Sequence, residues 1–353
     1  MAIQWADDFG RYGTSGGTAA MLNGLPYANL GGSVENSPDP NDTGRAFRIN
    51  SAINEWPLDM RIALPTVVSG TIGIAARVWL SNLPGDNNQR PAVVGFQRAD
   101  GTYIVYARVE QNGAITIQGR VSGVESQRFN SVNPIIQPSS FNHYELVHNR
   151  ATGEGSLYIN GVLRATYTGV DTADNIAFTN MSNRSASISS IGMWVKDLVI
   201  WDSTGTQNNT VIGTVIVRRL KPNSDDTLGG WIPSTGTTGF NLLAKDAVND
   251  STFITGDILP TPASQFNMEN LPADVTSVRA LIPVVRARKV DGGDASLQLG
   301  LTPNGTNYDN GPVSPTTPAY TYYYDVSELN PATGAAWTPV SVDSVRLRVN
   351  RTV

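Results

Sequence analysis

The chain has 353 residues, no cysteine, 16% charged residues and a formal net charge of −5. This length exceeds that of most single domains and suggests two. The missing cysteines exclude disulfides, thiolate metal sites and cysteine nucleophiles, and the acidic balance argues against a protein that binds nucleic acid through a general basic field.

We find no targeting signal. Residues 1–9 show neither the basic segment nor the apolar core of a signal peptide, and no run of about 18 apolar residues could cross a bilayer. Secreted proteins of this size often use disulfides. We therefore expect synthesis in the cytoplasm and no insertion into a membrane.

Alternating apolar residues predict strands in the first half of the chain. In residues 71–80 the apolar side chains recur at every second position, which predicts a half-buried strand. Residues 103–109 and 114–121 alternate in the same way on either side of Asn112-Gly113. Asn-Gly between two such runs is a strong hairpin signal.

A second group of strands follows. Residues 141–148, 156–159 and 162–167 are predicted to form a three-stranded meander with a tight Asn-Gly turn. Residues 191–201 carry apolar side chains on both faces, as expected for a strand at the centre of a sandwich.

The composition changes after this last strand. Residues 202–210 are rich in Ser, Thr, Gly, Gln and Asn, and this stretch is interpreted as a domain linker. We therefore place one domain at residues 1–203, the linker at 204–210 and a second domain at 211–353.

The second domain is also predicted to consist of strands. Pro283 marks an edge or a break, because proline cannot donate to a sheet, and a helix is considered only near residues 264–269. With 34 glycines and 21 prolines, the sequence predicts an all-β protein of short strands and turns. The strands expected in this domain are residues 211–220, 275–290, 296–301, 320–325 and 342–349.

Segments of the first domain resemble a known superfamily. Residues 141–148 lead through a loop to 155–163, a short strand that ends in Tyr-Ile-Asn-Gly. Residues 5–9 (WADDF) and 194–202 (WVKDLVIWD) supply matching first and last strands. Together they resemble the concanavalin A-like lectin/glucanase superfamily, which includes laminin-G-like domains. This resemblance implies a jelly-roll β-sandwich over residues 1–203, in which the first strand pairs with the last.

A second resemblance concerns the remainder. Residues 201–209, 215–222, 231–234 and 330–338 are similar to segments of proteins encoded among virion genes of tailed phages and prophages. Those proteins pair a lectin-like domain with a C-terminal β-domain. The resemblance implies a tail-, neck- or capsid-associated particle component, with a smaller C-terminal β-sandwich that serves virion docking or oligomerisation.

The carboxylates do not show the spacing of a glycosidase. Glucanases of the superfamily place their acidic residues at alternate positions of one strand, where they share a face, and a retaining pair needs a separation of about 5 Å. Asp7 and Asp8 are adjacent, Glu145 is isolated, and Asp197 and Asp202 are five residues apart. We therefore predict that the chain is not an enzyme.

Metal binding is also not expected. His143 and His148 are five residues apart in one predicted strand, so they face opposite sides and cannot share an ion. Calcium remains an alternative, since relatives of the lectin-like fold bind it through loop carboxylates. The candidate ligands are Asp86, Asp171 and Asp174, although such residues also suit ordinary turns. No cofactor is predicted.

Aromatic residues offer two kinds of binding surface. Trp56, Trp79 and Tyr106 are candidates for a sugar platform, although packing in the core is the more common use of such residues. Alternating tyrosines in residues 320–325 suit a core as well as an interface between subunits, and for a virion protein we expect the interface. The basic residues in 286–289 are interpreted as a solvated strand face.

These observations favour a non-catalytic structural component of a phage particle. It would act through protein–protein contacts with other virion proteins, as a homo-oligomer for which we expect a trimer. The alternative is a carbohydrate-binding protein of the tail that recognises a glycan receptor on the host. In either case the protein is expected in the virion, without nucleic-acid or membrane partners.

Overall fold

The computed structural model describes most of the chain, which divides into two compact units. The main boundary falls between Val217 and Arg218, and of the described residues before it only Leu25 groups with the second unit. The described residues are 3–12, 25–30, 32–39, 44–49, 59–64, 70–85, 91–131, 133–172, 176–182, 191–245, 249–256, 263–290, 293–315 and 318–352.

The first unit contains a large antiparallel sheet. Its strands are β1 (Ile3–Asp7), β3 (Gly32–Asn36), β4 (Arg45–Ile49), β6 (Thr71–Leu80), β11 (Phe141–Asn149), β12 (Glu154–Ile159), β13 (Val162–Tyr167) and β15 (Met193–Asp202). They follow the order β13-β12-β11-β6-β15-β4-β3, and β1 also pairs with β15. We call it the first sheet.

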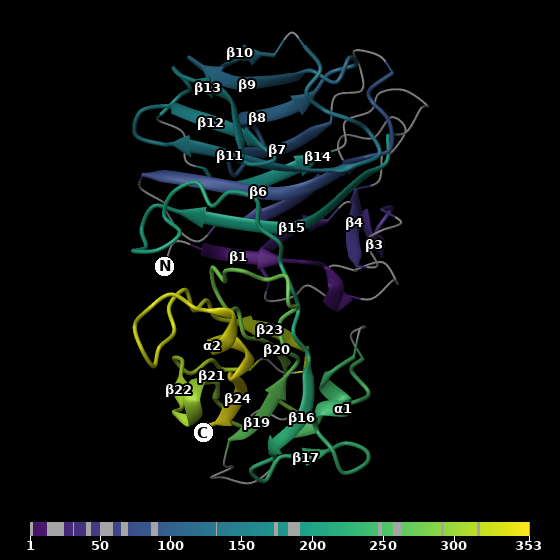
Figure 1. Cartoon of the computed structure of the whole chain (residues 1–353), viewed down its shortest axis with the longest axis vertical. Helices are drawn as coiled ribbons and strands as arrows, with labels where there is room; N and C mark the ends of the chain where they lie inside the picture. Colours follow the sequence, from purple (N-terminus) through teal and green to yellow (C-terminus); the bar gives the residue numbers. More distant parts are fainter. Residues whose placement is uncertain are drawn as a thin grey trace. The chain divides into compact units, whose positions relative to one another are not determined.

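A second antiparallel sheet stacks against the first (Figure 1). Its strands are β2 (Tyr27–Leu30), β5 (Asp59–Ala63), β7 (Ala92–Gln97), β8 (Tyr103–Val109), β9 (Ile115–Val121), β10 (Val124–Asn130) and β14 (Phe178–Ser182). They follow the order β10-β9-β8-β7-β14-β5-β2. The core lies between the sheets, where Phe96 of β7 contacts His148 of β11 at a ring-centroid distance of 6.2 Å.

The predicted turns and pairings of this unit are confirmed. Strands β8 and β9 form the hairpin expected from the Asn-Gly signal, and β11, β12 and β13 form the meander. Its turn residues Asn160 and Gly161 both have positive φ angles, of 51° and 77°, which matches the twist of a two-residue hairpin. The first strand pairs with the last, as the resemblance implied, with Trp5 opposite Ile200.

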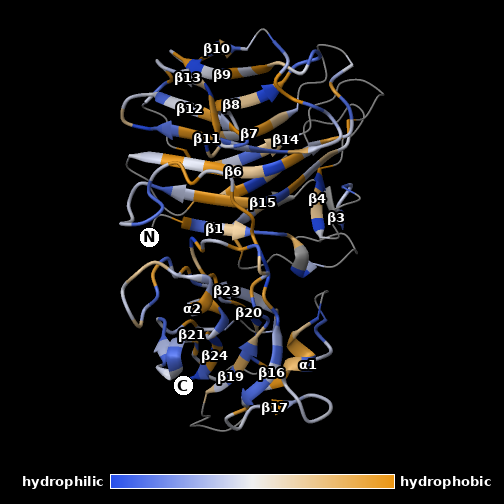
Figure 2. Cartoon of the chain, in the orientation of Figure 1, coloured by the Kyte–Doolittle hydropathy of each residue, from blue (hydrophilic) through white to orange (hydrophobic). Residues whose placement is uncertain are grey.

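The second unit is smaller and also mainly β. Its main sheet has the order β16-β19-β24-β21-β22, and its core contains Phe266, Leu299 and Val349. Figure 2 shows hydrophilic residues along β16 and hydrophobic residues along much of β15 in the first unit. The strands of the main sheet are β16 (Pro222–Thr227), β19 (Ser264–Met268), β21 (Leu297–Thr302), β22 (Tyr308–Asp309) and β24 (Arg346–Arg351).

Two strand pairs and two short helices complete the second unit. The fold class is as predicted: all-β, with an antiparallel β-sandwich followed by a smaller C-terminal β-domain. Among the residues described, no helix is long and apolar enough to cross a membrane. The pairs are β17 (Ile232–Pro233) with β18 (Ile254–Thr255) and β20 (Val284–Ala287) with β23 (Thr321–Tyr324), and the helices are α1 (Phe240–Leu243) and α2 (Pro339–Asp343).

Three segments of the second unit differ from the sequence analysis in type or extent, while the break predicted at Pro283 is confirmed. Residues 264–268 form the strand β19, not a helix, because tertiary pairing overrides weak local preference. Only residues 284–287 of the long run 275–290 form a strand, which begins directly after Pro283. The run 342–349 begins in α2, whose N-terminus is fixed by a capping box between Thr338 and Ser341.

The segment that follows the first domain also differs from the prediction. Residues 211–220 do not form a strand. The boundary between the compact units lies at 217/218 and not at the predicted linker 204–210, because residues 212–217 bind to the first sheet through hydrogen bonds to side chains. Strand β6 is buried on both faces, not half-buried.

We predict that Gly73→Ala destabilises the first unit. A Cβ atom at Gly73 would lie 2.1 Å from Cε2 of Trp201, so the indole would have to move, at a cost of about 1–3 kcal/mol. Gly311→Ala is the control, because no atom lies within 4 Å of a Cβ there. Urea unfolding followed by tryptophan fluorescence measures the effect, and equal stability of both variants would contradict this packing.

Candidate functional site

Four neighbouring strands place one side chain each in a row on the outer face of the first sheet. Phe141 of β11 is directly opposite Trp79 of β6. Trp79 is opposite Trp194 of β15, and Trp194 is opposite Arg48 of β4. Strands lie about 4.8 Å apart, so the row spans about 14 Å. We call Phe141, Trp79 and Trp194 the aromatic row.

The aromatic row is held by contacts along its length. The rings of Trp79 and Phe141 meet edge to face with centroids 5.4 Å apart. The guanidinium carbon of Arg48 lies 5.1 Å from the ring centroid of Trp194. Phe141 and Trp194 are half-buried, whereas Trp79 is 9% exposed. The row therefore combines fixed rings with partial exposure at both ends.

A charged pair borders the end of the row at Trp194. Glu35 of β3 accepts a hydrogen bond from the indole Nε1 of Trp194 at 3.3 Å. It also pairs with Arg48 at 3.4 Å, and the two charged side chains are 34% and 39% exposed. Aromatic faces beside exposed hydrogen-bonding groups are suited to flat ligands that have an apolar face and polar edges.

A basic row runs parallel to the aromatic row, one pair of residues further along the strands. It contains His143, Arg77 and Lys196, which are opposite one another on β11, β6 and β15. Arg77 lies 4.8 Å from the ring centroid of Phe141 and pairs with Asp197 at 3.0 Å. This contact joins the two rows.

The imidazole ring of His143 is buried without a hydrogen bond. Its side chain is 2% exposed, and neither ring nitrogen has a partner. Burial, with a smaller contribution from the charge of Arg77, lowers the pKa of His143 to about 4. On the inner face, burial likewise lowers the pKa of His148 to about 4, with a smaller contribution from Arg150. The two imidazoles lie on opposite faces, as the alternation predicted, and are neutral at pH 7.

Residues 212–217 cross the outer face of the first sheet beside the basic row. The backbone N–H groups of Ile212 and Gly213 donate to the two oxygens of Glu145 at 2.8 and 3.0 Å. Trp201 Nε1 donates to the same carboxylate at 3.0 Å. Val217 N donates to Asp197 at 3.0 Å. We call this stretch the strap.

Asp197, the second side chain that binds the strap, has an unusual backbone conformation. Asp197 has a φ of 50°, and the pairing of β15 with β6 shifts register between Lys196 and Val199. This bulge turns the carboxylate towards both Arg77 and the strap. Burial raises the pKa of Asp197, and the charges of Lys196 and Arg77 oppose that effect.

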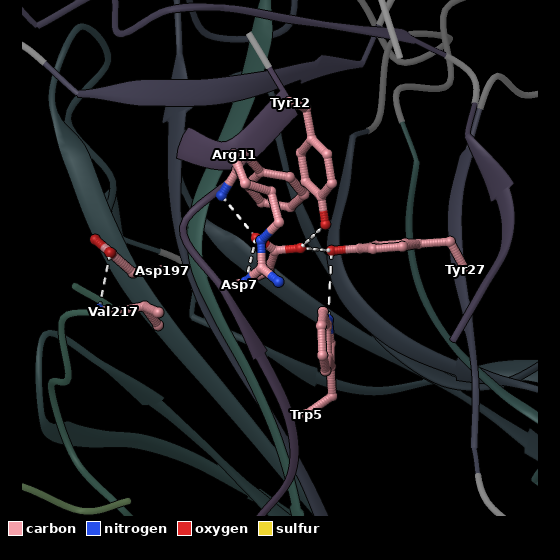
Figure 3. A network of polar contacts seen from close by, with 8 residues as sticks. Trp5, Asp7, Arg11, Tyr12, Tyr27, Asp197 and Val217 are labelled. Carbon is pink, nitrogen blue, oxygen red and sulfur yellow. Dashed lines mark hydrogen bonds and ion pairs between the residues drawn. The ribbon is translucent and has the colours of Figure 1, made fainter. Parts of the chain in front are cut away.

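Asp7 forms a separate buried network (Figure 3). Its carboxylate accepts hydrogen bonds from Tyr12 Oη at 2.5 Å, Tyr27 Oη at 2.7 Å and Phe9 N at 2.8 Å. Arg11 lies 3.6 Å away. Burial is the largest cause of the raised pKa of both tyrosines, followed by the charge of Asp7. This carboxylate holds the chain together between β1 and β2.

The structure separates the sugar-platform candidates. Trp79 lies at the centre of the aromatic row. Tyr106 is 3% exposed, packs on Tyr103 at a centroid distance of 4.5 Å, and donates its hydroxyl to Glu125 at 2.6 Å. A buried ring with a bound hydroxyl does not offer a platform. Trp56 lies outside the described residues.

Of the calcium candidates, only Asp171 can be placed. Its two carboxylate oxygens accept the backbone N–H groups of Ser122 and Gly123 at 2.7 and 2.9 Å, so it holds the β9–β10 turn. Asp86 and Asp174 lie outside the described residues. Within the described ranges, no three His, Asp or Glu residues form a metal-binding group.

Sequence reasoning missed Trp194, Phe141 and Arg48. Both aromatic residues were placed in predicted strands, but strand alternation does not say which residues of distant strands lie opposite each other. Gly192 was a further signal, since a Cβ there would lie 2.2 Å from the ring of Trp194.

Comparisons with known proteins find distantly similar solved structures but no matching family. No protein-family model and no curated protein matches the chain. Among solved structures, the cellulose induced protein Cip1 is 15% identical with a TM-score of 0.42, covering 60% of this chain and 100% of its own. The carbohydrate binding module CBM66 from Bacillus subtilis is 11% identical with a TM-score of 0.34, covering 52% and 99%.

A phage protein is also among the similar structures. It is a carbohydrate esterase from Shiga toxin-encoding bacteriophage phi24B, 10% identical with a TM-score of 0.37, covering 52% of this chain and 99% of its own. At these values the likeness does not transfer a function.

We predict that Glu145→Gln loosens the strap. The new amide group places a donor where the backbone N–H groups of Ile212 and Gly213 donate, so at least one charge-assisted hydrogen bond is lost, at a cost of about 2 kcal/mol. Hydrogen exchange at residues 212–213 should accelerate at least tenfold. Glu154→Gln, at an exposed position, is the control. Unchanged exchange would contradict the role of Glu145.

Acid sensitivity provides a second test. The folded-state pKa of both histidines is about 4, below the ordinary 6.5, so the unfolded chain binds more protons between these values. The contribution of these neutral histidines to the free energy of unfolding is therefore fully present above pH 6.5. It is lost as the pH drops towards 4, by about 3 kcal/mol per histidine.

The variant His143→Leu isolates one histidine. Because its imidazole has no hydrogen bond, we expect equal or higher stability at pH 7.5 and about half the wild-type loss of stability between pH 7 and 4.5. Urea unfolding at a series of pH values gives both quantities. A wild-type pH dependence in the variant would show that His143 is not buried in the neutral form.

Proposed function

We propose that the chain is a non-catalytic component of a bacteriophage particle and that the outer face of its first sheet binds a glycan. The aromatic row is the observation that carries this proposal. It aligns Phe141, Trp79 and Trp194 across three adjacent strands, and its two ends are partly exposed.

The chemistry of the row fits a sugar. A pyranose ring has an apolar face of C–H groups that packs on an aromatic ring, while its hydroxyls need donors and acceptors at the edge. Arg48 and Glu35 are partly exposed beside Trp194 and supply both. Because the rings are fixed by packing and by the Arg48 contact, little side-chain entropy is lost on binding.

The buried carboxylates support the absence of catalysis. Asp7, Glu145, Asp197 and Asp202 are the buried carboxylates that the structure describes in the first unit, and each accepts hydrogen bonds from the protein. They serve the network of Asp7, the strap and the turn after β15. A glycosidase needs a carboxylate pair that faces the substrate, and these groups face their own donors.

The placement in a phage particle rests on the sequence. The segments 201–209 and 330–338 are similar to segments of virion proteins. A homo-oligomer, with the trimer as the expected form, stays a prediction.

The glycan proposal is tested with Trp194→Ala. The wild-type chain is first screened on an array of bacterial surface glycans. For the best neutral ligand we expect Trp194→Ala to weaken binding at least tenfold. The variant loses the aromatic ring and, with it, the cation–π contact that positions Arg48. Phe129→Ala, a half-buried aromatic residue on β10, is the control. An unaffected Trp194→Ala, or a wild type without any glycan ligand, would overturn the proposal.

A further inference from the structure

A second surface with the properties of a ligand site lies on the strand pair β20–β23 of the second unit. Arg286 is opposite Tyr322 in this pair. Its guanidinium carbon lies 4.8 Å from the ring centroid of Tyr320 and 5.6 Å from that of Tyr322. The guanidinium carbon of Arg288 lies 4.7 Å from the ring centroid of Tyr320. We call these four residues the Arg–Tyr column.

The column corrects two interpretations made from the sequence. The basic residues in 286–289 are not simply a solvated strand face, because Arg286 and Arg288 contact the tyrosine rings, and Tyr322 is buried as a core residue. The guanidinium groups of the arginines stack on the tyrosine rings. Cation–π contacts of this kind fix a guanidinium in one orientation, so the two arginines are pre-organised.

The two arginines differ in their partners. Arg286 is mostly buried and forms an ion pair with Asp250. Arg288 is exposed, and within the described part of the chain its contacts are the ring of Tyr320 and the carbonyl of Pro318, which accepts from Nη1 at 3.2 Å. No described carboxylate pairs with Arg288. In a chain of net charge −5, this is an oriented and uncompensated cation.

We propose that the Arg–Tyr column binds an acidic polysaccharide through the carboxylates of its sugar units. The planar guanidinium of Arg288 presents a fork of donors that matches a carboxylate. Tyr320, which is partly exposed, supplies a ring edge for the sugar beside it, and the buried Tyr322 holds Arg286 from below. The site extends the proposed function from neutral to acidic glycans but uses none of the residues of the aromatic row.

The surroundings favour a polysaccharide over a protein partner. Specific protein interfaces have an apolar centre and bury about 1,200 Å² or more. Here the exposed residues next to the column are Pro318 and Ala319, which precede β23, and Arg288 and Val290, which follow β20. A narrow surface with one oriented guanidinium and one ring edge suits an extended anionic chain better than a broad subunit face.

The test uses the intact chain and polygalacturonate as the probe, measured by calorimetry at low salt. We expect binding that weakens with ionic strength and that Arg288→Gln reduces at least tenfold. Arg288→Lys should fall between wild type and Arg288→Gln, because lysine keeps the charge and loses the fork. Arg218→Gln removes the same charge at another exposed position and should bind as the wild type does.

Polyglutamate separates an acidic polysaccharide ligand from an acidic protein partner. No binding of polygalacturonate, or equal loss in Arg288→Gln and Arg218→Gln, overturns the proposal. Polyglutamate bound as tightly as polygalacturonate overturns it in favour of an acidic protein partner. Thermal unfolding verifies that each variant is folded. Loss of neutral-glycan binding in Trp194→Ala and loss of polygalacturonate binding in Arg288→Gln are separate measurements, so a failure of the aromatic row and a failure of the column are distinguishable.

Discussion

Glu145 and Asp197 are buried carboxylates on the outer face of a sheet, and a buried charge is tolerated only when donors surround it. The strap meets this requirement with three backbone N–H groups. The same contacts fix the path of the chain as it leaves the sandwich. The end of the first unit therefore depends on these two side chains and not on the polar composition of residues 204–210.

This dependence separates what the sequence could predict from what it could not. Alternation and Asn-Gly turns were sufficient for β8, β9 and the meander, because those signals are local. These local signals failed at residues 211–220. Alternation there arises because one side of the strap packs on the sheet, and the backbone N–H groups of the strap bind side chains instead of a neighbouring strand. The local signals also failed to show that β6 is buried on both faces, since a covering segment more than 130 residues away in sequence leaves no local mark.

The candidate sites follow the same rule. Trp79 could be named as a platform residue from its type, but its neighbours in the aromatic row come from strands about 60 and 115 positions further along. Tyr106 has the same residue chemistry and is buried against Tyr103. The Arg–Tyr column was visible in the sequence as two separate patterns, and only the pairing of β20 with β23 joins them. Both proposed binding surfaces therefore depend on which residues the strand register places opposite each other.

The proposed place in a phage particle is tested most directly by cryo-electron microscopy of purified particles. We predict ordered copies on the particle with the aromatic row directed to solvent, where a host glycan can reach it. Absence of the protein from the particle would contradict the virion assignment. Copies with the aromatic row buried against a neighbouring subunit would contradict glycan binding and leave a purely structural protein.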